Sequence, residues 1–169
     1  ISMGLRFGTF SITLTLIPIV VGSALYGWGS GAWLGFVFGV TVLLTGDANL
    51  FLAVNIPGTI ITVILKGTLA GAAAGFVYKL ISKKNQIAAV IVSAVVAPVV
   101  NTGIFVLGSY VFFFDYISEL AKGTNLFVFI LVGFVGINFF IELGINLVLN
   151  PAILQIIRIG KKNFRGKNQ

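Results

Sequence analysis

No charged residue occurs between Phe7 and Gly46, and this uncharged stretch constrains the fold more than any other feature of the chain. One membrane-spanning helix needs about 20 apolar residues, so the stretch is long enough for two helices that fold back on each other. We expect the turn at residues 26–31, where three glycines alternate with aromatic and small residues. The stretch therefore predicts membrane-spanning helices at about residues 10–26 and 32–45.

Three further apolar stretches follow, at about residues 57–80, 86–114 and 126–149. Pro57 can begin the first of these helices, because proline is favoured at the first helical position. Only 9% of the residues are charged, against about 25% in a soluble domain. We therefore predict an all-α integral membrane protein, with five spans in a single transmembrane domain over residues 1–169.

Basic residues collect at one end of the predicted spans. That end carries eight bases and no acids, whereas the opposite end carries two bases and three acids. The positive-inside rule then places a basic tail, residues 158–169, in the cytoplasm and a loop, residues 1–9, outside the cell. Five spans would leave Ile1 outside without a signal peptide, so we expect that one further helix precedes it. A five-span protein with a translocated N-terminus is the alternative.

Histidine and cysteine are both absent. Their absence excludes disulfides, thiolate zinc sites, cysteine nucleophiles and histidine bases. The chain also has no GxxxxGK[ST] phosphate loop. We therefore expect no catalytic residue, no metal site, no cofactor and no nucleic-acid partner.

Lys66 and Glu142 are the only charged residues deep within the predicted spans. A charge at the bilayer centre costs about 2.5–3.5 kcal/mol, so it usually faces a charged partner or a wet cavity. A structural Lys66–Glu142 pair is one interpretation. The other is a binding site in the outer half, because the Lys66 side chain leans toward the N-terminal end of its helix. Asn101 and Thr102 reach a similar depth on an antiparallel helix, just after Pro98, and they join Lys66 as candidate binding residues.

Four polar residues on the last predicted helix repeat at every fourth position: Asn138, Glu142, Asn146 and Asn150. This spacing puts them along one stripe of a helix, which should face protein or water because lipid disfavours it. We expect Glu142, Asn146 and Asn150 to link helices, and Asn138 to reach the binding site.

Small residues form a third pattern. Glycines repeat at every fourth position on two predicted helices, as Gly31, Gly35 and Gly39 and as Gly67, Gly71 and Gly75. This spacing lets helix backbones approach closely. It predicts either packing within the bundle or a face that docks on another membrane protein.

The order of these motifs resembles a known family. Residues 16–22, 25–27, 31–36, 63–67, 70–75, 98–103 and 138–142 together resemble the substrate-binding S component of an energy-coupling factor (ECF) vitamin transporter. The resemblance implies six helices with both ends cytoplasmic, in agreement with a missing first helix. It also implies a bacterial cell membrane, a vitamin captured from outside, and three partner subunits, namely one transmembrane coupling protein and two cytoplasmic ATPases.

Among S components, the chain is most similar to the pantothenate type. Pantothenate is an anion with hydroxyl groups and one amide, so it needs a cation and neutral hydrogen-bonding groups. These would come from Lys66, Arg6, Asn49, Asn55, Asn101 and Asn138. Niacin, another small anion, is the main competing ligand. The other functional hypotheses are an assembly subunit with a buried Lys66–Glu142 pair, a small channel and an intramembrane enzyme.

Overall fold

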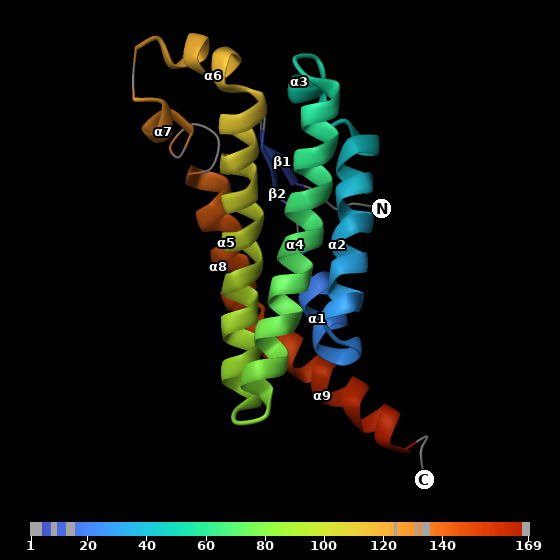
Figure 1. Cartoon of the computed structure of the whole chain (residues 1–169). Coiled ribbons are helices and arrows are strands. Elements are labelled where there is room, and N and C mark those ends of the chain that lie inside the picture. Colours follow the sequence, from blue (N-terminus) through green and yellow to red (C-terminus); the bar gives the residue numbers. More distant parts are fainter. Residues whose placement is uncertain are drawn as a thin grey trace.

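Three long helices stand side by side in the computed structural model (Figure 1). They are α2 (Trp28–Thr45), α4 (Ile56–Ser82) and α5 (Gln86–Phe112). Among the described residues these three helices are long and apolar enough to cross a membrane, and a bent pair of helices near the C-terminus makes a fourth candidate. The predicted helical membrane fold is confirmed. The structure describes residues 5–7, 10–12, 16–123, 125–130, 132 and 136–166.

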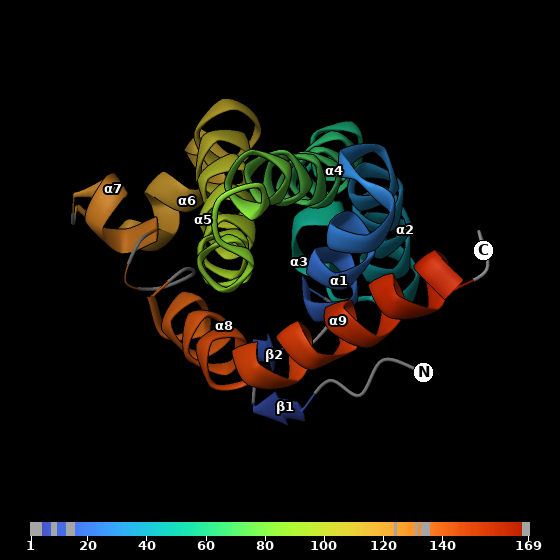
Figure 2. The ribbon, with the colours of Figure 1, turned by 90° about the horizontal axis from the view of Figure 1, so that it is seen from below.

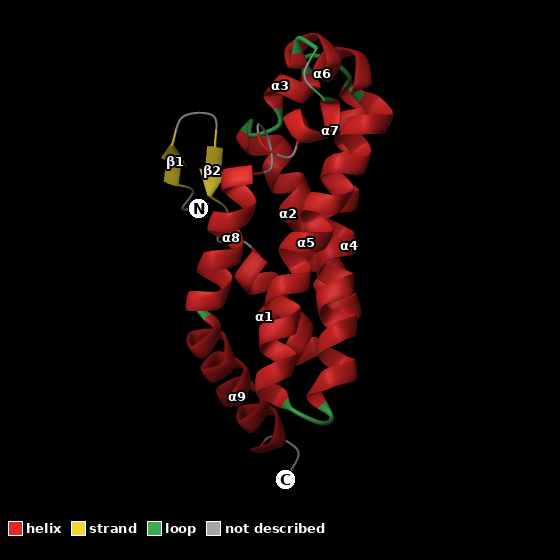
Figure 3. Cartoon of the chain, turned by 90° about the vertical axis from the view of Figure 1, so that its left-hand side faces the viewer, coloured by secondary structure: helices red, strands yellow, loops and turns green. Residues whose placement is uncertain are grey.

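The first predicted span begins later than its sequence indicates. Helix α1 (Leu16–Tyr26) has 11 residues, or about 17 Å at ~1.5 Å per residue, against a hydrocarbon core of about 30 Å. The preceding residues form a hairpin of β1 (Leu5–Phe7) and β2 (Phe10–Ile12), which lies beside α8 (Figure 3). Its register pairs Leu5 with Ile12 and Phe7 with Phe10, and aromatic and β-branched residues of this kind are enriched in strands. The prediction of a helix from residue 10 is therefore wrong.

The turn between α1 and α2 is also shorter than predicted. Gly27 alone connects Tyr26 to Trp28, with a φ of 97° that suits glycine and few other residues. The other two glycines of the predicted turn lie within α2. Helix α2 therefore begins four residues before its predicted start.

Asparagine caps begin the two longest helices. The Asn55 side chain accepts a hydrogen bond from the Gly58 amide at 2.9 Å, and Pro57 lies in the first turn of α4 as expected. The Asn85 side chain accepts hydrogen bonds from two amides in the first turn of α5, those of Ile87 and Ala88. These caps fix where α4 and α5 begin, and a short turn at residues 83–85 joins the two helices.

The last predicted span is divided into several pieces. It contains α7 (Leu126–Phe129) and α8 (Ile137–Val148), and α9 (Asn150–Gly166) follows after a bend of 54°. The predicted basic tail is therefore helical up to residue 166. Two short helices, α3 (Asn49–Leu52) and α6 (Phe114–Ala121), lie at the opposite end of the bundle (Figure 1). We name the two ends of the molecule the α3 end and the α9 end.

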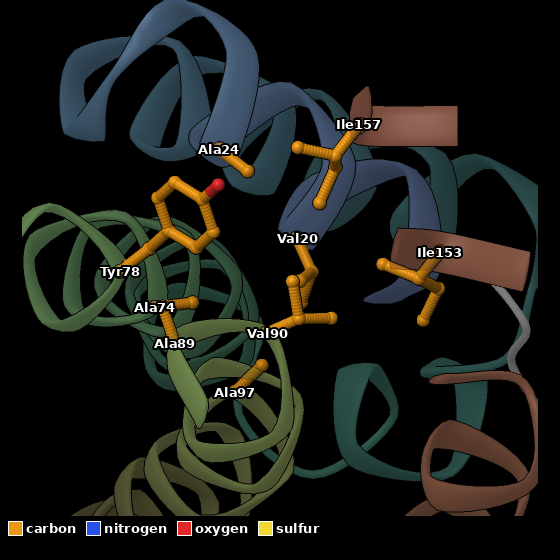
Figure 4. Close-up of a cluster of buried hydrophobic side chains, with 9 residues drawn as sticks. All are labelled: Val20, Ala24, Ala74, Tyr78, Ala89, Val90, Ala97, Ile153 and Ile157. Carbon is orange, nitrogen blue, oxygen red and sulfur yellow. The ribbon is translucent and has the colours of Figure 1, made fainter. Parts of the chain in front are cut away.

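The largest buried cluster lies toward the α9 end and joins four helices (Figure 4). Alanines supply the contact between α4 and α5, where they allow the two backbones to approach closely. Larger side chains fill the space toward α1 and α9. The cluster consists of Val20, Ala24, Ala74, Tyr78, Ala89, Val90, Ala97, Ile153 and Ile157.

Candidate functional site

Helix α4 packs against α2 through glycines. Gly35 and Gly67 face each other so closely that a Cβ atom on either would overlap the carbonyl of the other, and Gly31 and Gly71 face each other in the same way. A Cβ atom on Gly39 would lie 2.9 Å from the carbonyl oxygen of α4 residue Val63. A Cβ atom on the sixth predicted glycine, Gly75, would lie 2.6 Å from the Cα atom of Trp28. All six predicted glycines thus lie at contacts within the bundle.

Toward the α3 end, beyond the alanines of the core, the side of α4 that meets α5 carries polar residues. Lys66 is half-buried, and its Nζ atom lies 5.5 Å from the centroid of the Phe105 ring. A lysine at this distance over a ring makes a cation–π interaction. Asn101 and Ser109 lie four residues to either side of Phe105, which puts all three on one stripe of α5.

Three oxygen atoms on this part of α4 and α5 are buried and make no hydrogen bond within the described part of the chain. They belong to Asn101, which is 9% exposed, Ser109, which is 1% exposed, and Thr62, which is 4% exposed. Thr62 lies one helical turn from Lys66 and packs against Gly108 of α5. Buried polar atoms nearly always have a partner, and an unsatisfied one costs about 1–3 kcal/mol. We refer to Thr62, Lys66, Asn101, Phe105 and Ser109 as the α4–α5 cluster.

Aromatic side chains extend the cluster toward the α3 end. The Phe51 ring of α3 lies 5.5 Å from the Phe105 ring and 5.0 Å from the Phe113 ring, both in edge-to-face geometry. Such pairs contribute about 0.5–1.5 kcal/mol beyond the burial of their area. Helix α3 therefore supplies an apolar wall beside the polar groups. A lysine, neutral hydrogen-bonding groups and an aromatic wall together suit a small polar ligand.

The comparison with known proteins gives one match. A family model described as "ECF transporter, substrate-specific component" matches residues 1–154. The chain belongs to this family. It is a substrate-binding S component, a transporter subunit and not an enzyme, and S components pair with an ECF energy-coupling module and bind small substrates. No curated protein and no solved structure matches the chain.

The other residues predicted to bind the ligand lie outside the α4–α5 cluster or outside the described side chains. The Asn55 side chain caps α4 and also donates a hydrogen bond to the Phe112 carbonyl at 3.3 Å, which ties α4 to α5. Asn49 is exposed at the start of α3, and Thr102 is half-buried, about 100° around α5 from Asn101. The remaining predicted residues, Arg6 in β1 and Asn138 and Glu142 in α8, have side chains outside the part that the structure describes.

Asn146 lies buried where α8 meets α5. Pro98 has no amide hydrogen, so the carbonyl of Ala94, four residues earlier, has no donor within the helix. The Asn146 side chain donates a hydrogen bond to that carbonyl at 3.3 Å. Asn150, one turn further along, is also buried, and its Nδ2 atom makes no hydrogen bond within the described residues. Asn146 thus links α8 to the irregular point of α5.

Four residues at this site were not predicted from the sequence: Phe51, Thr62, Phe105 and Ser109. Helical spacing could have found three of them, because Thr62 lies four residues before Lys66, and Phe105 and Ser109 lie four and eight residues after Asn101. No sequence signal pointed to Phe51, because its contact depends on the path of α3.

Proposed function

We propose that this S component captures a small vitamin anion at the α4–α5 cluster, and that the vitamin is pantothenate. One observation carries the proposal: Lys66 lies over the Phe105 ring, on the same side of α4 as buried oxygen atoms that make no hydrogen bond within the described residues. The lysine supplies the positive charge that a carboxylate requires. A charge-assisted hydrogen bond of this kind is shorter and stronger than a neutral one.

The neutral groups of the cluster match the rest of such a molecule. The Thr62 and Ser109 hydroxyls can both donate and accept, and the Asn101 amide offers two donors and an acceptor. Pantothenate presents hydroxyl groups and an amide that need this mixture. Niacin is the second candidate, because the Phe51 and Phe105 rings would pack well against an aromatic ring.

Uptake would need the remaining subunits of the transporter. We propose that they are one transmembrane coupling protein and two cytoplasmic ATPases, which bind this S component in a bacterial cell membrane. In this arrangement the α9 end faces the cytoplasm and the α3 end faces outward. The charge distribution supports the orientation: Lys79, Lys83, Lys84, Arg158 and Lys162 are exposed at the α9 end, whereas Asp47, Asp115 and Glu119 lie at the α3 end.

Two measurements test the proposal. Calorimetric titration of the purified S component with pantothenate, niacin and thiamine should show saturable binding of pantothenate, with weaker binding of niacin and none of the cationic thiamine. Binding of thiamine alone, or of none of the three, would contradict it.

A reporter that is active only outside the cell should give no signal when it is fused to the C-terminus, and a strong signal there would overturn the orientation.

A further inference from the structure

Helix α9 crosses the end of the bundle instead of continuing α8. The 54° bend between the two helices turns its axis, and the view from below shows α9 passing under α1 (Figure 2). Its later turns extend beyond the other helices (Figure 1). The described part of the chain leaves much of the surface of α9 exposed.

Three residues fix the rotation of α9 about its own axis. Ile153 and Ile157 are almost fully buried in the cluster of Figure 4. Gly160 packs so closely on α1 that a Cβ atom there would lie 2.8 Å from the Leu25 side chain. These positions are three or four residues apart and form one face of α9. Because this face packs on the bundle, the residues on the other faces of α9 are the exposed ones.

The two exposed flanks of α9 differ in chemistry. Ile156 and Ile159 are 49% and 54% exposed, and with exposed Ala152 they form an apolar flank at spacings of three and four residues. Arg158 and Lys162 are exposed on the other flank, again four residues apart. An apolar flank beside a basic flank is typical of a helix that lies in the surface of a membrane.

The charge of the α9 end indicates which kind of surface it would bind. Exposed Lys79, Lys83 and Lys84 add to the basic flank at the α9 end. The four acids of the chain occupy positions 47, 115, 119 and 142, and none of them falls in α9 or in the α4–α5 turn. The end is therefore strongly positive, and anions are its natural partners.

We propose that α9 lies in the membrane–water interface, where its apolar flank enters the acyl-chain region and its basic flank binds the phosphates of anionic phospholipids. Both flanks then have partners at one depth, because headgroup phosphates and acyl chains adjoin there. An acidic protein surface would satisfy the lysines and the arginine but would leave the two isoleucines without an apolar partner. Lipid binding at α9 does not depend on which vitamin the S component binds.

Site-directed spin labelling tests the depth of each flank. The chain has no cysteine, so Ile159→Cys and Lys162→Cys each provide a single labelling site in the full-length protein. In nanodiscs, the label at position 159 should be accessible to oxygen and shielded from a water-soluble nickel chelate, and the label at 162 should show the reverse. Access of the nickel chelate to both labels would overturn the proposal.

Lipid preference tests the basic flank. In nanodiscs that mix phosphatidylglycerol with phosphatidylcholine, the wild-type protein should retain phosphatidylglycerol preferentially, as measured by mass spectrometry of co-purified lipid. Each basic residue near the membrane surface strengthens the binding of anionic lipid about fivefold. The double variant, Arg158→Gln with Lys162→Gln, should therefore lower the preference for phosphatidylglycerol about 25-fold. Lys122→Gln, an exposed lysine at the α3 end, is the matched control and should leave it unchanged. An unchanged preference in the double variant would contradict lipid binding and favour an acidic protein partner.

Discussion

The two sides of α4 use the same helical spacing for different purposes. Toward α2, Gly67 and Gly71 repeat at every fourth residue and bring two backbones into direct contact. Toward α5, Thr62 and Lys66 repeat at the same interval and present a hydroxyl and an ammonium group. The first side has no room for added atoms, whereas the second has polar atoms that make no hydrogen bond within the described residues. With binding at the α4–α5 cluster as proposed, packing and binding lie on different sides of one helix, and substitutions should separate them.

The largest effect is expected on the glycine side. Gly35→Leu would place a branched side chain against the Gly67 carbonyl, where backbone and not a flexible side chain blocks it. Overpacking usually costs about 1–3 kcal/mol, and here we expect the upper end, about 3 kcal/mol. Size-exclusion chromatography and thermal unfolding in detergent should show a destabilised protein.

Gly103→Leu is the matched control, because Gly103 lies on α5 and a Cβ atom there would have no neighbouring atom within 4 Å. This variant should purify and unfold like the wild type. A Gly35→Leu protein as stable as the control would show that the α2–α4 contact is looser than described.

The next largest effect is expected at Lys66. Lys66→Met keeps most of the apolar stem and removes the ammonium group, whose charged hydrogen bond contributes about 1.5–3 kcal/mol. Affinity for the vitamin should fall about ten- to hundredfold, while thermal stability should be retained. Lys79→Met, an exposed lysine on the same helix, should bind like the wild type in the same titration.

A structural Lys66–Glu142 pair predicts the opposite pattern. Removal of Lys66 would then leave Glu142 buried without its partner, at a cost of about 3–5 kcal/mol in stability. The double variant, Lys66→Met with Glu142→Gln, would restore that stability. Unchanged affinity together with this rescue would contradict the binding role of Lys66.

A moderate effect is expected where α8 joins α5. Asn146→Ala should leave the Ala94 carbonyl without its donor and destabilise the protein by about 1–2 kcal/mol. In a Pro98→Ala background the restored amide would serve that carbonyl, so the same substitution should cost less than about 0.5 kcal/mol. Thermal unfolding of the four proteins gives the coupling energy. Equal losses in both backgrounds would show that this hydrogen bond contributes little.

The smallest effect is expected at the aromatic ring. Phe105→Leu removes the ring beside Lys66 but keeps an apolar side chain, and a cation–π contact is worth about 0.5–1 kcal/mol when partly exposed. Affinity should fall about two- to fivefold. Phe76→Leu, on the exposed surface of α4, should have no effect on the titration. A Phe105→Leu loss as large as that of Lys66→Met would mean that the ring, and not the ammonium, dominates binding.

Much of the bundle could be predicted from the sequence, because the length of an uncharged stretch and the residues at a helix start are local features of the chain. Pro57 predicted the start of α4 to within one residue, although Asn55, predicted as a binding residue, proved to be its cap. The start of α5 at Gln86 was predicted from the polar turn before it. The regular glycine spacing indicated a close helix contact. Lys66 and Asn101 could be assigned to a similar depth because their helices are antiparallel.

The remaining features depend on contacts between distant segments. Phe10 and Ile12 suit a strand or an apolar helix equally well, and only their pairing with β1 decides between the two. Phe51 joins the site because α3 turns it toward Phe105 and Phe113. The sides of α9 are fixed by Gly160 packing on α1, which no periodicity in the sequence reveals.

Native mass spectrometry of the purified S component tests most directly whether the α4–α5 cluster binds a vitamin. We predict that the wild-type protein retains one small molecule with the mass of pantothenate. Lys66→Met should retain little of it, and Lys79→Met as much as the wild type. A wild-type protein that carries no adduct after incubation with pantothenate or niacin, or a Lys66→Met protein with undiminished occupancy, would contradict a binding site at this lysine.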